Sequence, residues 1–196
     1  MVDIPAHLLS KSIQSLKRKK MDNIALGPDG QANHALAIMR HETREGDLAT
    51  DLHFLPGLDL HADPALGLTG RYSSPEGRVL EMEAQTHGQG GWCGLHVRLP
   101  AEKLHHVGSI GFAARIAAPE VFVARACIRS GGPDGFSDCF FDKHLLFRPE
   151  EASHVDAIPV HYREPMPMEA AWRELIFFLP TSNFRLSFID LRLFVV

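Results

Sequence analysis

Charged side chains recur at every second position in several stretches of the sequence. His96 and Arg98 are two positions apart, and Arg125 and Arg129 are four apart. In an extended strand such residues point to the same face, so they would share the polar face of a sheet. Guanidinium groups bind carboxylates and sugar hydroxyls through paired hydrogen bonds, so we expect a ligand-binding patch. Its expected members are Glu81, Glu83, His96, Arg98, Arg115, Arg125 and Arg129.

The same side chains allow two other interpretations. Glutamates and arginines on neighbouring strands stabilise a sheet by pairing with one another, which would give a lattice of salt bridges and no ligand site. The N-terminal segment could also cover this face. Both alternatives remain open beside ligand binding.

Few aromatic side chains are available to stack on the apolar face of a sugar ring. Trp92 follows a glycine-rich stretch at 87–91, which predicts an exposed loop, although this side chain could also fold inward as a plug. Tyr72 and Tyr162 are the next candidates. The predicted ligand-binding residues are Trp92, Arg98, Arg125, Arg129, Tyr72 and Tyr162.

The twelve histidines do not have the spacing of a metal site. His105 and His106 are adjacent and would leave opposite faces of a strand. His154 and Asp156 match the first two ligands of a two-His-one-carboxylate site, but the only later histidine, His161, follows too closely. The three cysteines have no C-x-x-C spacing and are expected to be buried thiols. We therefore expect no metal and no cofactor.

Catalytic motifs are also missing from the sequence. It contains no G-x-S-x-G elbow, no P-loop and no G-x-G-x-x-G turn. Glu81 and Glu83 could form a carboxylate pair of the glycosidase type, yet glutamates at alternate positions are ordinary on a solvated strand face. The sequence therefore predicts a protein that is not an enzyme.

The candidate residues lie in segments where apolar and polar residues alternate. Leu80, Met82 and Ala84 alternate with polar side chains, and the same period of two appears at 95–99, 110–116 and 122–128. Apolar runs follow at 136–147, 172–179 and 184–196, with a shorter candidate near 155–162. Glycine, proline and aspartate turns separate these roughly eight or nine strands. Residues 67–196 are therefore predicted to form an antiparallel β-sandwich of the jelly-roll type.

Residues 1–66 are expected to form an N-terminal arm, partly helical and partly irregular. Leu9, Ile13 and Leu16 form one apolar stripe on a helix that ends in a run of lysines, which favours docking to another chain or another copy. Residues 35–39 are apolar and fit either a buried helix turn or a strand. Residues 46–64 are expected to be an irregular connector.

The C-terminal segments AWRELIFFLP at 171–180 and FRLSFIDLRL at 184–193 resemble the closing hairpin of galactose-binding-like carbohydrate-binding modules. In that family a tryptophan opens the penultimate strand, here Trp172, and an aromatic-aliphatic-Asp step lies in the last strand, here ending at Asp190. The resemblance implies a jelly roll used for sugar binding, adhesion or structural roles. We expect Trp172 to pack over the sheet. A structural Ca²⁺ at Asp190 is possible by resemblance, but without companion ligands a capped bulge is expected.

The composition excludes several classes of protein. Hydrophobic residues make up 45% and charged residues 22% of the chain, which is ordinary for a globular protein. A net charge of -4 does not indicate nucleic-acid binding, and no apolar stretch is long enough to span a membrane. Without a signal peptide we expect a cytoplasmic protein, with particle association or leaderless export open.

Together these features predict a non-catalytic, carbohydrate-binding-module-like protein that recognises a glycan or polysaccharide. The alternative is a structural attachment or oligomerisation protein, such as a spike, fibre or capsid-decoration subunit, built on the same sandwich.

Overall fold

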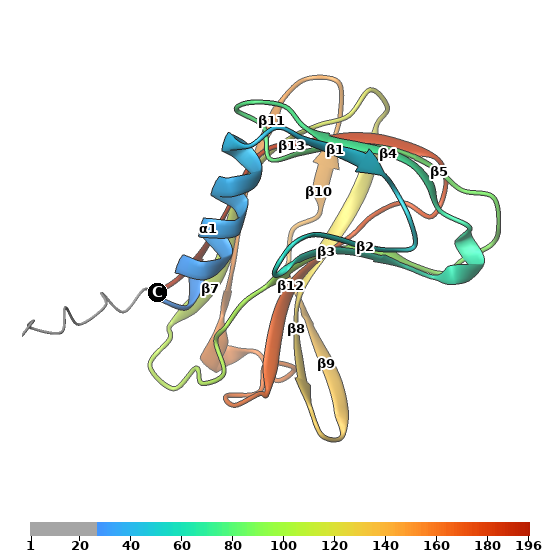
Figure 1. The fold of residues 1–196 in the computed structure, drawn as a ribbon. Coiled ribbons are helices and arrows are strands. Elements are labelled where there is room, and N and C mark those ends of the chain that lie inside the picture. The colour runs from blue at the N-terminus through green and yellow to red at the C-terminus, as the bar shows by residue number, and fades with distance from the viewer. Residues whose placement is uncertain (1–26) are drawn as a thin grey trace, which may run out of the picture.

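Thirteen β-strands form two antiparallel sheets that pack face to face in the computed structural model, which describes residues 27–196 (Figure 1). The predicted antiparallel β-sandwich of the jelly-roll type is confirmed. One sheet has six strands in the order β1 (Arg44–Asp47), β4 (Thr69–Ser74), β5 (Leu80–Gln85), β13 (Phe184–Val195), β7 (Ser109–Ala117) and β11 (Ala152–Pro159).

The other sheet has seven strands. Six follow in the order β10 (Leu145–Phe147), β8 (Phe122–Gly132), β12 (Trp172–Phe178), β6 (Cys93–Arg98), β3 (Leu58–Ala62) and β2 (Asp51–Leu55). The seventh, β9 (Gly135–Phe140), pairs with β8 and extends with it as a long hairpin (Figure 1). Short 3₁₀ turns occur at η1 (Pro64–Leu66) and η2 (Val160–Tyr162).

The alternation of apolar and polar residues in the sequence matches the side chains that are buried in the core and those that face solvent. On β5, Leu80, Met82 and Ala84 are buried, whereas Glu83 is exposed and Glu81 half-buried. The inward residues of both sheets join one hydrophobic cluster. Burying this apolar surface is the main force that holds the two sheets together.

The predicted boundary at residue 66 is wrong, because three strands of the sandwich lie before it. Residues 46–64 are not an irregular connector: β2 and β3 form a hairpin at the edge of the seven-stranded sheet, and β3 pairs with β6. Leu58 and Leu60 are fully buried in the core. Gly57 has a φ of 84°, which the tight turn between the two strands requires and which favours glycine.

The apolar segment at 35–39 lies in a helix, α1 (Pro28–His41), that runs beside β13 (Figure 1). Leu36 and Met39 are buried in the common core, so α1 is part of the sandwich. Asn33 Nδ2 donates to the Leu193 carbonyl at 2.8 Å, and its Oδ1 accepts from the Leu193 N–H at 2.9 Å. The predicted amphipathic helix with Leu9, Ile13 and Leu16 lies outside the described residues.

A buried arginine ties two loops to the end of β12. Arg173 is turned into the sandwich and donates to the carbonyls of Ala101 and Pro167, at 2.6 Å each, and to the Ser130 hydroxyl. Within residues 27–196 no carboxylate lies within 4.0 Å of it. Burial lowers the pKa of Arg173 to about 10, so the guanidinium is still charged at neutral pH.

A β-bulge lies near the middle of β13. The register against β7 shifts between Phe188 and Asp190, as predicted for an aspartate that interrupts an apolar strand. Asp190 Oδ1 accepts from the Leu191 N–H at 3.1 Å and lies 3.1 Å from Arg40 on α1. The Asp190 side chain therefore caps the irregular backbone and pairs with the helix.

Candidate functional site

The polar patch predicted for one sheet face is divided between two faces, so the prediction of a single patch is wrong. Strands β5 and β7 belong to the six-stranded sheet, while β6 and β8 belong to the other. Which strands are neighbours cannot be read from alternation alone. Glu81, Glu83 and Arg115 therefore lie on the outer face of the six-stranded sheet. On the outer face of the seven-stranded sheet are His96, Arg98, Arg125 and Arg129.

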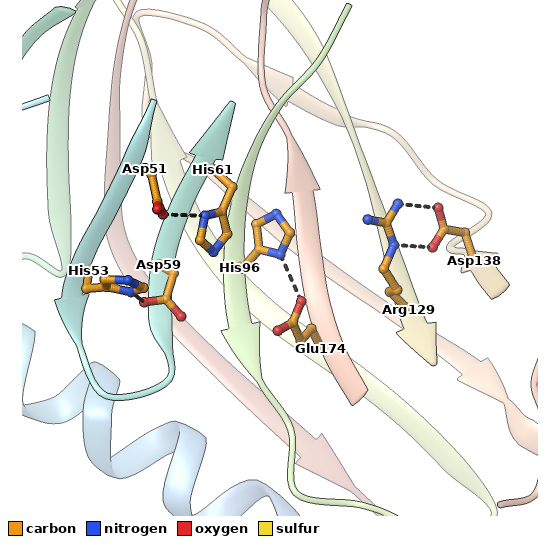
Figure 2. A network of polar contacts seen from close by, with 8 residues as sticks. All are labelled: Asp51, His53, Asp59, His61, His96, Arg129, Asp138 and Glu174. Atoms are coloured by element: carbon orange, nitrogen blue, oxygen red, sulfur yellow. Dashed lines mark hydrogen bonds and ion pairs between the residues drawn. The ribbon is translucent and has the colours of Figure 1, made fainter. Parts of the chain in front are cut away.

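The outer face of the seven-stranded sheet carries a ladder of polar side chains that contact one another across neighbouring strands (Figure 2). Asp51 lies 2.9 Å from Nδ1 of His61, whose ring meets that of His96 edge-on with centroids 4.8 Å apart. His96 Nδ1 lies 2.9 Å from Glu174 Oε2. The predicted lattice between rows of glutamate and arginine is not what forms here: the pairs join His61 to Asp51, His96 to Glu174 and Arg129 to Asp138.

Arg129 and Glu174 are fixed as charged groups in this ladder. Arg129 donates two hydrogen bonds to Asp138, both at 2.7 Å, and this pairing raises the pKa of Arg129 above its ordinary value. The hydrogen bond from His96 lowers the pKa of Glu174. Both side chains are therefore ionised and oriented near neutral pH.

Two of the predicted arginines also cover aromatic rings. The guanidinium carbon of Arg125 lies 3.9 Å from the centroid of Phe140, and that of Arg129 lies 3.9 Å from Phe136. These cation–π contacts hold the guanidinium groups against the sheet. Arg98 is exposed beside Glu174 on β12.

A groove of about 640 Å³ lies on the outer face of the six-stranded sheet. Arg71 on β4 and Arg185 on β13 are both register partners of Glu83 on β5, so the three side chains form a row across the sheet. A second row, from Ser73 through Glu81 to Ser187, runs beside it. Ala117, Ala118, Pro119 and Pro149 form an apolar part of the wall.

The two rows differ in whether their polar side chains already have partners within the protein. Glu81 accepts a hydrogen bond from Ser187 at 2.8 Å and pairs with Arg78 at 3.1 Å. Between residues 27 and 196, neither Arg71 nor Arg185 forms an ion pair of 4.0 Å or less with Glu83 or with any other carboxylate. The row of Arg71, Glu83 and Arg185 therefore presents donors and acceptors that are open to a ligand.

Of the predicted aromatic residues, the structure brings only Tyr72 to this groove. Its ring packs edge-on against Phe54 with centroids 4.8 Å apart, so much of the ring serves the core. Trp92 is 43% exposed in the loop before β6, as predicted, and Tyr162 is 85% exposed in η2; both lie outside the groove. Trp172 packs over the sheet as predicted, resting on Gly131.

Sequence reasoning missed Arg71 and Arg185. Arg71 precedes Tyr72 in a short strand whose alternation is interrupted by Gly70, and Arg185 lies in a long apolar strand. The signal that singles them out is their shared register with Glu83, which depends on strand order.

His154 and Asp156 both lie on the inward side of β11. The His154 ring stacks on Phe112 at a centroid distance of 5.4 Å, and burial lowers the pKa of His154. Among residues 27–196, no group of three or more histidine, cysteine or acidic side chains is placed to hold a metal ion. The cysteines are buried, and burial raises the pKa of Cys93 and Cys127 to about 12. No helix in the described part of the chain is long and apolar enough to cross a membrane.

Comparison with known proteins finds similarity at the level of the fold. No protein-family model matches the chain, and no curated protein matches it. Among solved structures it is similar to the family 11 carbohydrate-binding module from Clostridium thermocellum in complex with a beta-1,3-1,4-mixed-linked tetrasaccharide. That match has 11% identity and a TM-score of 0.41, and it covers 77% of this chain and 87% of that one.

Two further solved structures are also similar. One is the family 11 module of the cellulosomal cellulase Lic26A-Cel5E of Clostridium thermocellum, at 10% identity and a TM-score of 0.41, covering 79% of this chain and 88% of that one. The other is the enzymatically active domain of tailspike protein 4 of bacteriophage CBA120, at 8% identity and a TM-score of 0.37, covering 79% of this chain and 19% of that one. All three are similarities of fold, at 8–11% identity and TM-scores of 0.37–0.41.

Proposed function

We propose that the protein is a non-catalytic glycan-binding module whose ligand lies in the groove of the six-stranded sheet. The observation that carries this proposal is the row of Arg71, Glu83 and Arg185. Three charged side chains stand at adjacent positions across three strands, inside a hollow, without pairing with one another. The groove of about 640 Å³ is of the size usual for ligand sites.

The chemistry of this row suits sugar hydroxyls, each of which donates and accepts hydrogen bonds. Arg71 and Arg185 supply donors in a fixed fork, and Glu83 between them supplies acceptors. Neighbouring strands are about 4.8 Å apart, so donors and acceptors alternate at short intervals across the groove. The apolar wall at Pro119 and Pro149 can contact the C–H groups of a sugar ring.

A binding role also accounts for the second row of the groove. Glu81 is engaged by Ser187 and Arg78, which fixes its carboxylate in place beside Glu83. A glycosidase needs one carboxyl group that acts as an acid and one that acts as a base or nucleophile. An acceptor tied to two donors is a positioned recognition group instead.

Substitution of the unpaired arginines tests the proposal. Arg185→Ala and Arg71→Ala should each weaken binding about tenfold or more, because a hydrogen bond to a charged group is worth about 1.5–3 kcal/mol. Both arginines are exposed, so the melting temperature should stay near that of the wild type. A glycan array that includes the mixed-linked β-1,3-1,4 tetrasaccharide, followed by calorimetric titration, measures the effect.

Arg192→Ala is the matched control, since Arg192 is an exposed arginine on the same strand as Arg185 but outside the groove. It should bind as the wild type does. Equal losses in Arg192→Ala and Arg185→Ala, or no binding of any glycan by the wild type, would reject the groove as a glycan site. A stable oligomer in light scattering together with no glycan binding would favour the attachment role.

A further inference from the structure

Two exposed aromatic side chains flank one glycine on the outer face of the seven-stranded sheet. Trp172 on β12 and Phe136 on β9 are both register partners of Gly131 on β8. Trp172 is 37% exposed and Phe136 is 60% exposed. Because β9, β8 and β12 are successive strands, the two residues stand about 10 Å apart on one face. We call Phe136, Gly131 and Trp172 the aromatic strip.

Gly131 allows the indole of Trp172 to lie directly on the sheet. A Cβ atom at this position would be 1.9 Å from Cε2, 2.1 Å from Cζ2 and 2.4 Å from Nε1 of Trp172. Any other residue at Gly131 would therefore push the indole away. One side of the indole covers the backbone of Gly131, and the exposed remainder of the ring forms a platform.

A row of fixed charges runs beside the aromatic strip, one register step along the same strands. Asp138 on β9, Arg129 on β8 and Glu174 on β12 are successive partners in this row (Figure 2). The Arg129–Asp138 pair and the Glu174–His96 hydrogen bond hold these side chains in place. In the described part of the chain, Nη1 of Arg129 and Oε1 of Glu174 are left without a hydrogen bond. A donor and an acceptor thus stand next to the platform.

We propose that the aromatic strip and its charged row form a second glycan site, which takes a flat, neutral chain of β-linked sugars. A β-linked glucose ring carries its hydroxyls around the rim and shows C–H groups on both faces, so its face stacks on an aromatic ring. Its rim hydroxyls then reach Arg129 and Glu174. Arg129 covers one side of the Phe136 ring, so a ligand that extends across the strands would contact the indole of Trp172 and the side of Phe136 that is left exposed.

The charged row favours a glycan over a protein partner at this surface. The buried centre of a protein–protein interface is depleted of charged residues, whereas Asp138, Arg129 and Glu174 directly adjoin the two aromatic rings. Hydroxyl groups satisfy such charges without removing all of their hydration. This site is independent of the groove: the two lie on opposite sheets, so one molecule would hold two glycan chains at once.

Tryptophan fluorescence tests the proposal directly, since the chain has two tryptophans. Trp92→Phe leaves Trp172 as the only one. Titrating the full-length Trp92→Phe protein with cellohexaose, which is β-1,4-linked glucose, should give a saturable change in Trp172 emission. Maltohexaose, the α-1,4-linked isomer, forms a curved chain and should bind at least tenfold more weakly.

Variants in the same background separate stacking from folding. Phe136→Ala should weaken cellohexaose binding about tenfold while the thermal melt is retained, because Phe136 is exposed. Val123→Ala removes an exposed apolar side chain from the same face of β8 and is the control that should bind normally. Arg185→Ala in the groove should leave the Trp172 signal unchanged, so failure of the groove and failure of this site are distinguishable.

Two results would overturn the second site. One is the absence of any saturable Trp172 response to cellohexaose, or equal binding by Phe136→Ala and the unsubstituted background. The other is a concentration-dependent dimer in light scattering that Phe136→Ala dissociates, which would make the aromatic strip a contact between copies of this chain.

Discussion

Asn33 on α1 pairs with both backbone groups of Leu193 on β13, as a neighbouring strand would. Strand β5 accompanies β13 only as far as Phe188. Beyond the bulge, the edge of β13 that faces away from β7 is covered by α1 instead. A side-chain amide offers an N–H donor and a carbonyl acceptor in nearly the geometry of a peptide group. It therefore satisfies the backbone hydrogen bonds of this strand edge where no neighbouring strand is present.

Removing this amide should destabilise the protein. Asn33→Ala leaves the N–H and the carbonyl of Leu193 without partners, and we expect the free energy of unfolding to fall by about 1–3 kcal/mol. Urea denaturation measures the change. His34→Ala, at the next and exposed position of α1, should change the free energy by no more than about 0.5 kcal/mol. Equal effects of the two substitutions would contradict the role of Asn33.

Arg173→Met should lower the free energy of unfolding by about 3 kcal/mol. Methionine fills a similar volume but leaves the carbonyls of Ala101 and Pro167 and the Ser130 hydroxyl unsatisfied. Denaturant unfolding of this variant and of Arg98→Met, an exposed control, measures the difference. If Arg173→Met is as stable as the wild type, burying the unpaired charge costs as much as its hydrogen bonds contribute.

Gly131→Ala should displace the indole of Trp172. In the Trp92→Phe background, we expect its emission to shift to longer wavelength and the free energy of unfolding to fall by about 1–3 kcal/mol, as for an overpacked site. Gly132→Ala is the matched control, because a Cβ at Gly132 meets nothing within 4 Å. Unchanged emission in Gly131→Ala would show that the indole does not rest on this glycine.

His154 should make stability depend on pH. Burial lowers its pKa from the ordinary value of 6.5, so the unfolded chain takes up the proton before the folded protein does. The free energy of unfolding should therefore be greatest above 6.5 and fall as the pH decreases towards the lowered pKa. His154→Phe keeps the stacking on Phe112 and should lose this part of the slope.

Denaturation of His154→Phe and the wild type at about pH 7 and about pH 5 checks this sign. His144→Asn, a substitution of an exposed histidine, should keep the wild-type dependence. A wild-type slope in His154→Phe would assign the pH dependence to other groups.

The strands of the sandwich could be predicted where alternation is regular. Leu80, Met82 and Ala84 identify β5 because the side-chain period of a strand is two. Leu58, Leu60 and Ala62 alternate in the same way, but the segment is short and follows Pro56-Gly57. We expected a connector there, whereas the Pro-Gly pair is the turn of a hairpin.

The groove could not be predicted, because it depends on strand order. Arg71, Glu83 and Arg185 become neighbours only when β13 is placed beside β5, and a single sequence carries no signal for pairing over about a hundred residues. The sequence correctly predicts that Arg125 and Arg129 lie on a solvent-facing side of a sheet. Their partners Phe140 and Asp138 come from β9, which pairs with β8 in a register that alternation does not specify.

The positions of β12 and β13 set the order in which the chain can fold during synthesis. β13 lies between β5 and β7, and β12 lies between β8 and β6, so both sheets have their central strands encoded after residue 171. Until the ribosome has released residues 172–195, strands β5, β6, β7 and β8 each have an edge without a partner, and Arg173 has not yet joined its loops. Once these strands have been synthesised, the nascent chain therefore exposes unpaired strand edges until β12 and β13 follow, and a chaperone that shields them should raise the yield of soluble protein.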